Sequence, residues 1–354
     1  MISWVPKKTI NIDNINNNIL ECVKTKHFTN NGKNVQLTQE KIKKIFKIDQ
    51  DKEVLMTSNG AMGLNCLISG LNIKFNKKLR WVVQSFTFPC STQGNLIDSI
   101  IIDIDENMGP NINELNEKIN EYDGIVITNC FGTSVNIKLY EDFCKTHNKL
   151  LIFDNAASPL TYYENKNHIN YGDGCMVSLH HTKPIGFGEG GFIVFKKEFL
   201  EFMEKALCFG YSTMNRYLYN MYANNYKMSE IACIYISDYL NNIDDINNHH
   251  ITMINYFISE IKKNNIDNKI KLFPNYTNYS NCLMATIPII FNNIVSTDLF
   301  INNQIEAKKY YYPLGNNCSN SIDLFNKIIC LPLNTDVTFQ TIDLYVQIIK
   351  KYLD

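Results

Sequence analysis

The sequence predicts an α/β protein with a large domain, built on a mostly parallel seven-stranded sheet between helices, and a smaller α/β domain after it. First, short β-branched apolar runs alternate with helical patterns between about residues 50 and 155. Second, 354 residues with 45% hydrophobic content suffice for one large core and an attached smaller unit. Third, no run approaches the ~20 apolar residues of a membrane span, so we expect no membrane contact.

Seven apolar runs mark the expected strands of the large domain. They occupy residues 53–56, 81–83, 100–102, 125–127, 150–153, 176–179 and 192–195, the last two flanking a glycine-rich turn. Long helical patterns follow from about 196 to 264, and the rest of the chain resembles a small α/β unit ending in a helix around 342–353. We therefore expect a large domain at 1–245, with an N-terminal helical segment, and a small domain at 246–354.

Charge and cysteine usage exclude several classes of protein. A formal net charge of -1 and a pI of about 6.7 supply no broad positive field for nucleic acid. The residues after Met1 lack the apolar stretch of a signal peptide, and we expect a cytoplasmic protein. The 11 cysteines are scattered without Cys-x-x-Cys spacing, which indicates buried free thiols and no metal site.

The loops directly after the apolar runs are where chemistry is expected, because open α/β sheets bind ligands at the carboxyl ends of their strands. After the first run, residues 57–64 (Thr-Ser-Asn-Gly-Ala-Met-Gly-Leu) form a small-residue turn that opens a helix. The free N–H groups and partial positive charge of a helix N-terminus suit a phosphate. The same residues also fit an ordinary Asn-capped helix.

Two further loops carry an aromatic ring and a carboxylate. Phe88, where the chain leaves the second strand, either lies against a flat heteroaromatic ring or packs in the core. Asp154 directly follows a strand that should be buried. An ionised carboxylate there needs a cationic partner, unless it simply caps the next helix.

The strongest signal is the segment 178–191, Ser-Leu-His-His-Thr-Lys-Pro-Ile-Gly-Phe-Gly-Glu-Gly-Gly. Lys183, just beyond a strand and enclosed by glycines, fits a lysine that forms a Schiff base, whose pKa must fall before its amine can attack. Residues 186–191 also match the dinucleotide fingerprint Gly-x-Gly-x-x-Gly, but that fingerprint opens a helix, whereas 192–195 predict a strand. A triphosphatase phosphate loop is excluded because its lysine follows the glycines.

Taken in order, these motifs resemble the DegT/StrS family of sugar aminotransferases, fold-type-I enzymes that use pyridoxal phosphate (PLP) on the aspartate-aminotransferase scaffold. The resemblance runs from about residue 28 to 351. Family motifs are similar to residues 59–64, 85–88 (with Gln84 replacing a proline), 154–156, 178–191, 225–230 (Asn-Tyr-Lys-Met-Ser-Glu), 305–310 and 331–333. With the two C-terminal ranges counted as one landmark, these six ordered matches are more specific than any single one.

The resemblance implies a role for each matching residue. Lys183 would bind PLP covalently and carry a proton between substrate and cofactor, while Asp154 would keep the pyridine nitrogen protonated. Phe88 would stack on the ring. The cofactor phosphate would be bound by Asn59, Gly60, Ala61, Ser178 and, from the second subunit of a homodimer, Asn225.

Two positions depart from the family pattern. Ala61 stands where the family usually has Thr, and Ala157 stands where a Gln or His often reaches the phenolic oxygen of the cofactor. Either the protein binds the cofactor more weakly, or Asn129 and Asn155 compensate for the missing Thr and Gln or His side chains. The sequence leaves both possibilities open.

The expected substrate also follows from the resemblance. Enzymes for dicarboxylic amino acids hold carboxylates with arginines, and this chain has two, Arg80 and Arg216, which favours a keto sugar. Relatives that remove a hydroxyl carry His in place of the Schiff-base lysine, so Lys183 indicates amination, with His180 or His181 near the substrate. We expect glutamate as donor and the 4-keto group of a nucleotide-linked (dTDP or UDP) 6-deoxyhexose as acceptor. Amination at C-3, a cyclitol substrate and a catalytically silent PLP-fold binding or sensor protein are the alternatives.

Overall fold

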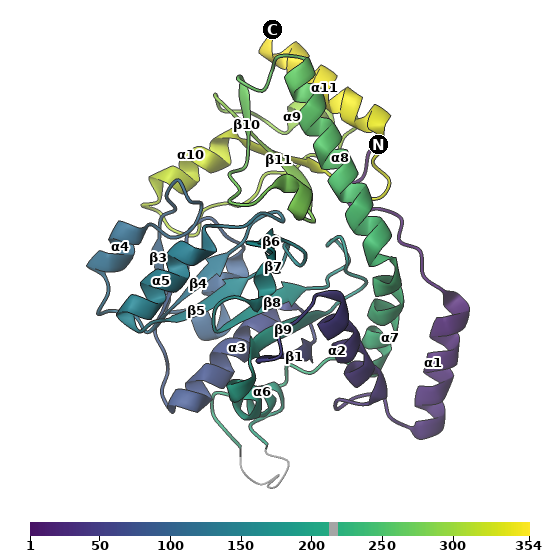
Figure 1. Ribbon diagram of the computed structural model, residues 1–354, viewed down its shortest axis with the longest axis vertical. Helices are drawn as coiled ribbons and strands as arrows, with labels where there is room; N and C mark the ends of the chain where they lie inside the picture. Colours follow the sequence, from purple (N-terminus) through teal and green to yellow (C-terminus); the bar gives the residue numbers. More distant parts are fainter. Residues whose placement is uncertain (212–218) are drawn as a thin grey trace.

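The computed structural model describes residues 1–211 and 219–354 and contains one large and one small sheet with helices around both (Figure 1). The large sheet contains β1 (Lys52–Thr57), β2 (Trp81–Gln84), β3 (Ile100–Ile102), β4 (Gly124–Thr128), β5 (Leu150–Asp154), β8 (Gly174–Ser178) and β9 (Gly191–Lys196). The small sheet contains β10 (Ile270–Leu272), β11 (Thr286–Phe291) and β12 (Ile328–Pro332), and a short hairpin pairs β6 (Tyr162–Tyr163) with β7 (Lys166–Asn167). The helices are α1 (Ile12–Thr25), α2 (Lys33–Ile45), α3 (Gly60–Phe75), α4 (Ile112–Glu117), α5 (Ile137–His147), α6 (Leu200–Leu207), α7 (Glu230–Tyr239), α8 (Ile243–Lys263), α9 (Asp298–Ile301), α10 (Ser319–Lys327) and α11 (Phe339–Leu353).

The order of strands in the large sheet is β1-β9-β8-β5-β4-β2-β3. Only β9 runs antiparallel to its neighbours, β1 and β8. The prediction of a mostly parallel sheet between helices is confirmed. Because the other six strands share one direction, their carboxyl ends meet at a single edge, and the loops after β1, β2, β5 and β8 come together there.

Alternating side chains divide the large sheet into two packed faces. In β1, Val54 and Met56 pack on the face covered by α2, α5 and α7, whereas Leu55 packs on the face covered by α3 and α6. The same alternation recurs in β5, where Ile152 faces α3 and both neighbours face the other side. Fully burying one such aliphatic side chain stabilises the fold by about 1.5–3 kcal/mol, which explains why continuous apolar runs mark the strands.

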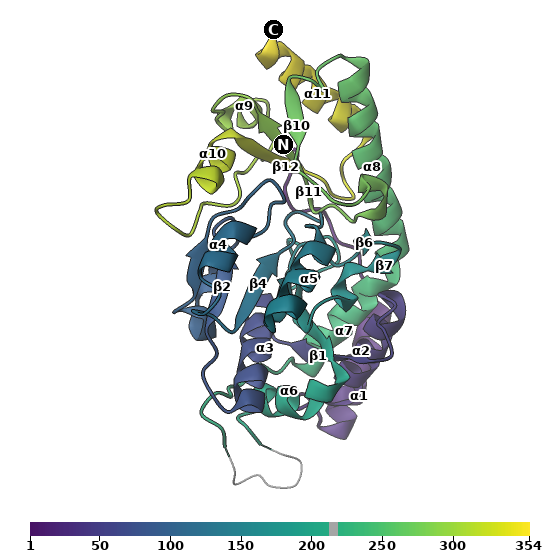
Figure 2. The same ribbon diagram turned by 60° about the vertical axis from the view of Figure 1, so that its left-hand side comes forward.

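The three antiparallel strands of the small sheet pack with α8 and α11 in a separate apolar cluster (Figure 2). Figure 2 shows this unit stacked on the edge of the large sheet where the carboxyl strand ends lie. The predicted domain boundary near residue 245 falls in the first turn of α8 and stays a prediction. The N-terminal residues belong to both parts, because Ile2 pairs with Ile305 of the small unit before the chain continues to α1.

The region between α6 and α7 differs from the sequence expectation of long helices from 196 to 264. Residues 208–211 and 219–229 are not helical. Gly210, at φ 84°, turns the chain, and isolated bridges pair Cys208 with Asn225 and Thr57 with Lys227. These long-range pairings replace the helical hydrogen bonds that a local pattern would favour.

The cysteines of the fold are free thiols, and its helices are only moderately apolar. Ten of the 11 cysteines are buried, Cys208 is half-buried, and all are free thiols. Across residues 1–211 and 219–354, no helix is long and apolar enough to cross a membrane.

Candidate active site

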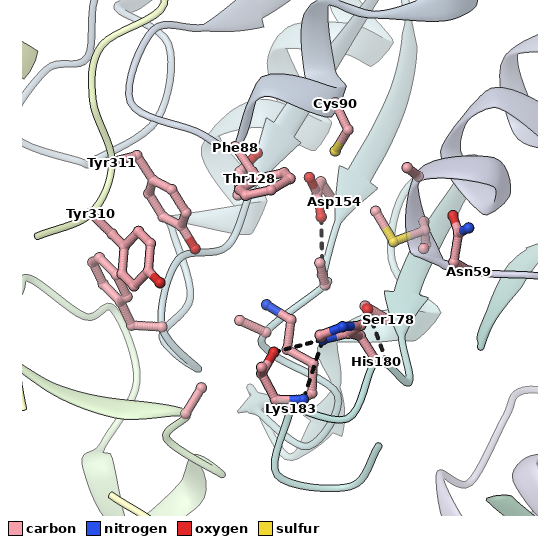
Figure 3. Close-up of a pocket in the computed structure, with 18 of the residues that line it drawn as sticks. Asn59, Phe88, Cys90, Thr128, Asp154, Ser178, His180, Lys183, Tyr310 and Tyr311 are labelled. Carbon is pink, nitrogen blue, oxygen red and sulfur yellow. Dashed lines mark hydrogen bonds between the residues drawn. The ribbon is translucent and has the colours of Figure 1, made fainter. Parts of the chain in front are cut away.

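A cavity of about 520 Å³ lies at the carboxyl edge of the large sheet, beneath the small sheet (Figure 3). Its wall includes eight residues singled out from the sequence: Asn59, Gly60, Ala61, Phe88, Asp154, Ser178, His180 and Lys183. They come from the ends of four strands or the loops that follow, so the parallel topology itself gathers motifs that lie up to about 120 residues apart in the chain.

The N-terminus of α3 forms one end of the cavity. Asn59 is extended (φ -164°, ψ 176°), and its side chain accepts a hydrogen bond from the Met62 N–H at 2.9 Å, which caps the helix. The preceding N–H groups, of Gly60 and Ala61, have no partner within a helix and line the cavity with Ser178. The expected Asn cap is therefore present, and the turn also lines the cavity, where the sequence predicts phosphate binding.

Gly60 is required by close packing between α3 and β8. A Cβ at this position would lie 2.9 Å from the Met176 Sδ and 2.9 Å from the Ser178 Cβ. The absence of a side chain therefore lets the helix terminus approach the end of β8, so that donors from both elements face one point.

Asp154, the last residue of β5, presents a buried carboxylate to the cavity, and only 1% of the residue is exposed. Its Oδ1 accepts the Ala156 N–H at 3.0 Å, whereas its Oδ2 is buried without a hydrogen-bond partner in the described part of the protein. Burial raises the pKa of this carboxyl, and the Ala156 N–H, the Lys183 ammonium and the nearby Ser91 hydroxyl offset that effect only in part. An unpaired, buried carboxylate oxygen is costly, which indicates a missing cationic or N–H partner.

Lys183 lies in the turn that follows β8 and extends toward the same cavity as Asp154 (Figure 3). Burial lowers the pKa of its amine, while the nearby Asp154 carboxylate acts in the opposite direction. A lowered pKa increases the neutral fraction of the amine, which is the form that attacks a carbonyl carbon. The glycines after Lys183 lead into β9, a strand, so the exclusion of a dinucleotide fingerprint is confirmed.

Phe88 is not a core residue. It is 53% exposed and lines the cavity, whereas its neighbour Phe86 is fully buried and packs against Phe131 and Phe273. Of the two possibilities for Phe88, core packing is excluded, and its ring is free to lie against a flat ligand.

The two neighbouring histidines are separated by the structure. His180 lines the cavity, where its Nδ1 contacts the Thr182 hydroxyl at 2.8 Å and its Nε2 lies 3.4 Å from a Glu189 carboxylate oxygen. His181 does not line the cavity; its Nδ1 accepts the Gly188 N–H and its ring packs edge-on against Phe187.

Asn225 also lies outside the cavity of its own chain. It is exposed, and its side-chain oxygen accepts a hydrogen bond from the Lys227 ammonium at 2.7 Å. Of the two arginines, Arg80 is exposed at the amino end of β2, where its backbone N–H donates to Asp123. Arg216 lies outside the described residues.

The two departures from the family pattern both lie in the cavity wall. Ala61 and Ala157 line it, together with Asn129, whose side-chain amide donates to the Asn155 Oδ1 at 2.7 Å. Asn129 is thus tied to Asn155 and, through its own oxygen, to the Val135 N–H.

Sequence reasoning missed the part of the wall that comes from outside the large sheet. Tyr310 and Tyr311 lie opposite Asp154 (Figure 3). Trp4 also lines the cavity, as do Ala285 and Thr286 at the start of β11. The Tyr311 ring stacks on that of Phe131 (centroids 5.4 Å apart), and Tyr310 meets Trp4 edge-on at 5.8 Å. The available signal in the sequence was the run of three tyrosines at 310–312, which begins at the last residue of the family landmark 305–310.

Two further residues of the cavity wall, Cys90 and Thr128, lie near Asp154. The Thr128 hydroxyl is hydrogen-bonded to that of Thr87 at 2.6 Å. Burial and the charge of Asp154 raise the pKa of the Cys90 thiol, so it stays neutral and leaves the carboxylate without a cation other than Lys183 in this part of the wall.

The chemistry of these groups fits PLP. A protonated pyridine nitrogen would supply the donor that Asp154 Oδ2 lacks, and the free N–H groups of α3 with the Ser178 hydroxyl suit the phosphate. The amine of Lys183 suits the aldehyde, and Phe88 suits the face of the ring.

Comparisons with known sequences and structures agree on the family and on the fold of this chain. The sequence model described as the DegT/DnrJ/EryC1/StrS aminotransferase family matches residues 10–350. Among solved structures, PseC of Helicobacter pylori, an aminotransferase of pseudaminic acid biosynthesis, is similar at a TM-score of 0.82 and 16% identity, over 99% of both chains. DesI, solved with its TDP-sugar product, is similar at a TM-score of 0.85 and 14% identity, over 100% of this chain and 93% of that chain. The dehydratase ColD, solved with GDP-perosamine, is similar at a TM-score of 0.81 and 17% identity, over 97% and 99%.

Proposed function

Because the chain belongs to the DegT/DnrJ/EryC1/StrS aminotransferase family, we propose that it is a PLP-dependent enzyme that transfers the amino group of glutamate to a keto sugar carried on a nucleotide. The observation that carries the proposal is the buried Asp154 carboxylate, whose Oδ2 lacks a partner in the described chain and faces the same cavity as Lys183. The acceptor we favour is the 4-keto group of a dTDP- or UDP-linked 6-deoxyhexose, which would give a 4-amino-4,6-dideoxy sugar. The expected compartment is the cytoplasm.

The residues proposed to bind the cofactor come from the ends of four strands. Asp154 holds a proton on the ring nitrogen, Phe88 covers one face of the ring, and the phosphate binds at the N-terminus of α3 with Asn59 as its cap. Ser178 adds its hydroxyl. Within residues 1–211 and 219–354, the oxygen of this hydroxyl accepts the His180 N–H at 3.3 Å and its hydrogen has no acceptor, so it can donate to the phosphate. When bound, PLP supplies a carbonyl carbon that condenses with amines and a protonated ring that accepts the electron pair left when a C–H bond breaks.

Lys183 is the residue proposed to move protons. Its lowered pKa leaves the amine free to act as a nucleophile toward an aldehyde and then as a base at Nζ, where it takes the proton from the α-carbon of glutamate. The same nitrogen returns a proton to the sugar carbon in the second half of the reaction. A histidine here would allow the dehydratase chemistry for which relatives such as ColD are named, and the amine of Lys183 instead supports amination.

The cavity wall supports a sugar nucleotide rather than a dicarboxylic acceptor. Trp4, Tyr310 and Tyr311 offer ring faces and hydroxyl groups, which suit a pyranose. Arg80 lies away from the cavity at the amino edge of the sheet, so it does not hold a substrate carboxylate. His180 and Thr182 at the rim are the proposed polar contacts, whereas His181 is placed away from the cavity and is the weaker candidate.

A homodimer is part of the proposal. Asn225 is exposed and does not line the cavity of its own chain, which supports a contribution to the cofactor phosphate of a second subunit. The active unit is then a two-fold dimer with two identical sites at its interface.

The test has two stages. Purified protein is incubated with PLP, reduced with borohydride and mapped by peptide mass; the pyridoxyl label is expected on Lys183 and is absent in Lys183→Ala. dTDP- and UDP-linked 4-keto-6-deoxyglucose are then supplied with glutamate, and the product is identified by mass and proton couplings. A label on another lysine, or on none, refutes the proposal. Product aminated at C-3, turnover of a cyclitol ketone only, or a labelled protein without turnover would point to the corresponding alternative function.

A further inference from the structure

The turn that carries Lys183 is held by two side chains from distant parts of the sequence. The Lys8 ammonium donates hydrogen bonds to the backbone oxygens of Lys183, at 2.7 Å, and of Gly186. The Tyr239 hydroxyl donates to the oxygen of Pro184 at 3.3 Å. Three of the four carbonyl oxygens between residues 183 and 186 therefore have a donor from outside the turn.

The turn is also fixed by packing. Gly186 is forced by close approach, because a Cβ there would lie 2.0 Å from the His180 carbonyl oxygen. The next residue, Phe187, stacks on Tyr235 with ring centroids 5.7 Å apart and contacts Tyr239 at 5.8 Å. The turn is therefore tight, and a shift of its backbone would move Lys183.

The Lys8 amine occupies a buried site formed by backbone carbonyl oxygens and an aromatic ring. Its nitrogen lies 4.8 Å from the centroid of the Tyr239 ring, a favourable cation–π distance. Burial lowers the pKa of its amine to about 7, which shows how far the group is withdrawn from water. A lysine that served only solubility would extend into solvent, as its exposed neighbour Lys7 does.

The segment before and after Lys8 is fastened on both sides. The Trp4 N–H donates to Glu306 at 2.7 Å, and the Lys7 N–H donates to Asp336 at 2.9 Å, both in the C-terminal part of the chain. After Lys8, the Asn11 N–H donates to Asp238 of α7 at 2.7 Å. The ammonium of Lys8 thus reaches the turn from a backbone already held in place.

We propose that Lys8 is a positioning residue that fixes the 183–186 turn so that the amine of Lys183 is presented to the cavity facing Asp154. Lys8 does not touch the reacting atoms and acts through the backbone of the turn. The part of the inference that concerns catalysis rests on the proposed function of Lys183, whereas the part that concerns the order of the turn does not.

The first experiment uses the cofactor-free protein. Hydrogen–deuterium exchange is followed in peptides covering residues 179–191 for the wild type, Lys8→Met, Lys8→Arg and the matched control Lys7→Met. Lys8→Met should accelerate exchange in this peptide about 10-fold or more, because two hydrogen bonds to its carbonyl oxygens are lost. Lys8→Arg, which keeps a charged donor, should restore most of the protection, and Lys7→Met should match the wild type.

The second experiment measures cofactor loading in the same variants. Lys8→Met should slow covalent PLP incorporation, read as borohydride-fixed label per minute, and lower kcat more than it raises KM for the sugar. Unchanged exchange at 179–191 in Lys8→Met would overturn the proposal, as would acceleration of the same size in Lys7→Met. If Lys8→Met does not fold, Lys8→Gln, a shorter neutral donor, must show the accelerated exchange. If Lys183 of the wild type is not labelled, the proposed function is refuted. The exchange experiment still tests whether Lys8 orders the 183–186 turn, because that result does not depend on the proposed function.

Discussion

Replacing Asp154 by Asn should have opposite effects on the cofactor-free and the cofactor-loaded protein. The carboxylate is buried, its Oδ2 lacks a hydrogen-bond partner in the described chain, and its pKa is raised chiefly by burial. The pKa of Asp154 is raised even though the Lys183 ammonium attracts the carboxylate. Ionisation of Asp154 therefore lowers the free energy of unfolding of the cofactor-free protein. An Asn can keep the bond from the Ala156 N–H through its oxygen and removes the charge.

The sign of the pH dependence follows from the raised pKa. The folded chain binds the Asp154 proton more tightly than the unfolded chain, so stability falls as pH rises from about 4, the unfolded value, through the higher folded pKa. Above the pKa of Asp154 in the folded chain, the stability lost through its ionisation no longer changes with pH. The stability difference between Asp154→Asn and the wild type should therefore be small near pH 4 and grow to a plateau toward pH 8.

The magnitude can be worked from the same contacts. Leaving a neutral buried polar group unpaired costs about 1–3 kcal/mol and a charged one more, so exchanging carboxylate for amide should stabilise the empty protein by about 1–2 kcal/mol. An unfolding entropy of about 2.1 cal/mol/K per residue gives roughly 0.7 kcal/mol/K for this chain. The corresponding rise in Tm is about 1–3 °C, within reach of scanning calorimetry on cofactor-free samples between pH 4 and 8.

In the loaded enzyme the same substitution should be harmful. The charge-assisted hydrogen bond to the ring nitrogen is worth about 1.5–3 kcal/mol, and without it the ring is a poorer electron acceptor, so kcat should fall at least about 10-fold. Stopped-flow measurement of the glutamate half-reaction checks this. A variant that is less stable than the wild type when empty, or that retains near-normal turnover when loaded, would refute the reasoning.

Three further predictions concern the phosphate end of the site and the dimer. Ala61→Thr should tighten PLP binding up to about 10-fold by adding a hydroxyl at the start of α3, measured by fluorescence titration; equal or weaker binding contradicts it. Gly60→Ala should lower the free energy of unfolding by about 1–3 kcal/mol, because its Cβ would lie 2.9 Å from the Ser178 Cβ; a urea midpoint equal to that of the wild type in the cofactor-free protein would disprove the packing argument. Co-expressed, differently tagged Asn225→Ala and Lys183→Ala chains should regain turnover in the mixed dimer, because one of its sites is intact; no recovery would exclude a shared site.

The sheet could be predicted because its strands are buried on both faces. Runs such as residues 125–127 read as strands without knowledge of their partners, and β4 (Gly124–Thr128) lies there. The break after α6 (Leu200–Leu207) could not be predicted in this way, because bridges such as that between Thr57 and Lys227 depend on residues far apart in the sequence. Helical periodicity extends past that point, and tertiary pairing overrides it.

The site was predictable where its residues end strands. Asp154 and Lys183 follow apolar runs directly, so the rule that ligands bind at carboxyl strand ends locates them. Trp4 and Tyr311 reach the cavity through packing of the small unit and the N-terminal segment, and no local pattern marks either as facing a ligand. The difference between His180 and His181 depends on the path of one turn, which sequence spacing alone leaves open.

The wall of the cavity is assembled from two sets of residues that are separate in the sequence. The residues suited to the cofactor lie between 59 and 183 on the large sheet, whereas the aromatic wall opposite comes from residue 4 and from 310–311. Under the proposed function, we expect substitutions in the second set to change which sugar is accepted while the chemistry of the first set stays intact. Because the two sets of residues are separate, evolution or protein engineering can alter the substrate specificity and retain the same reaction.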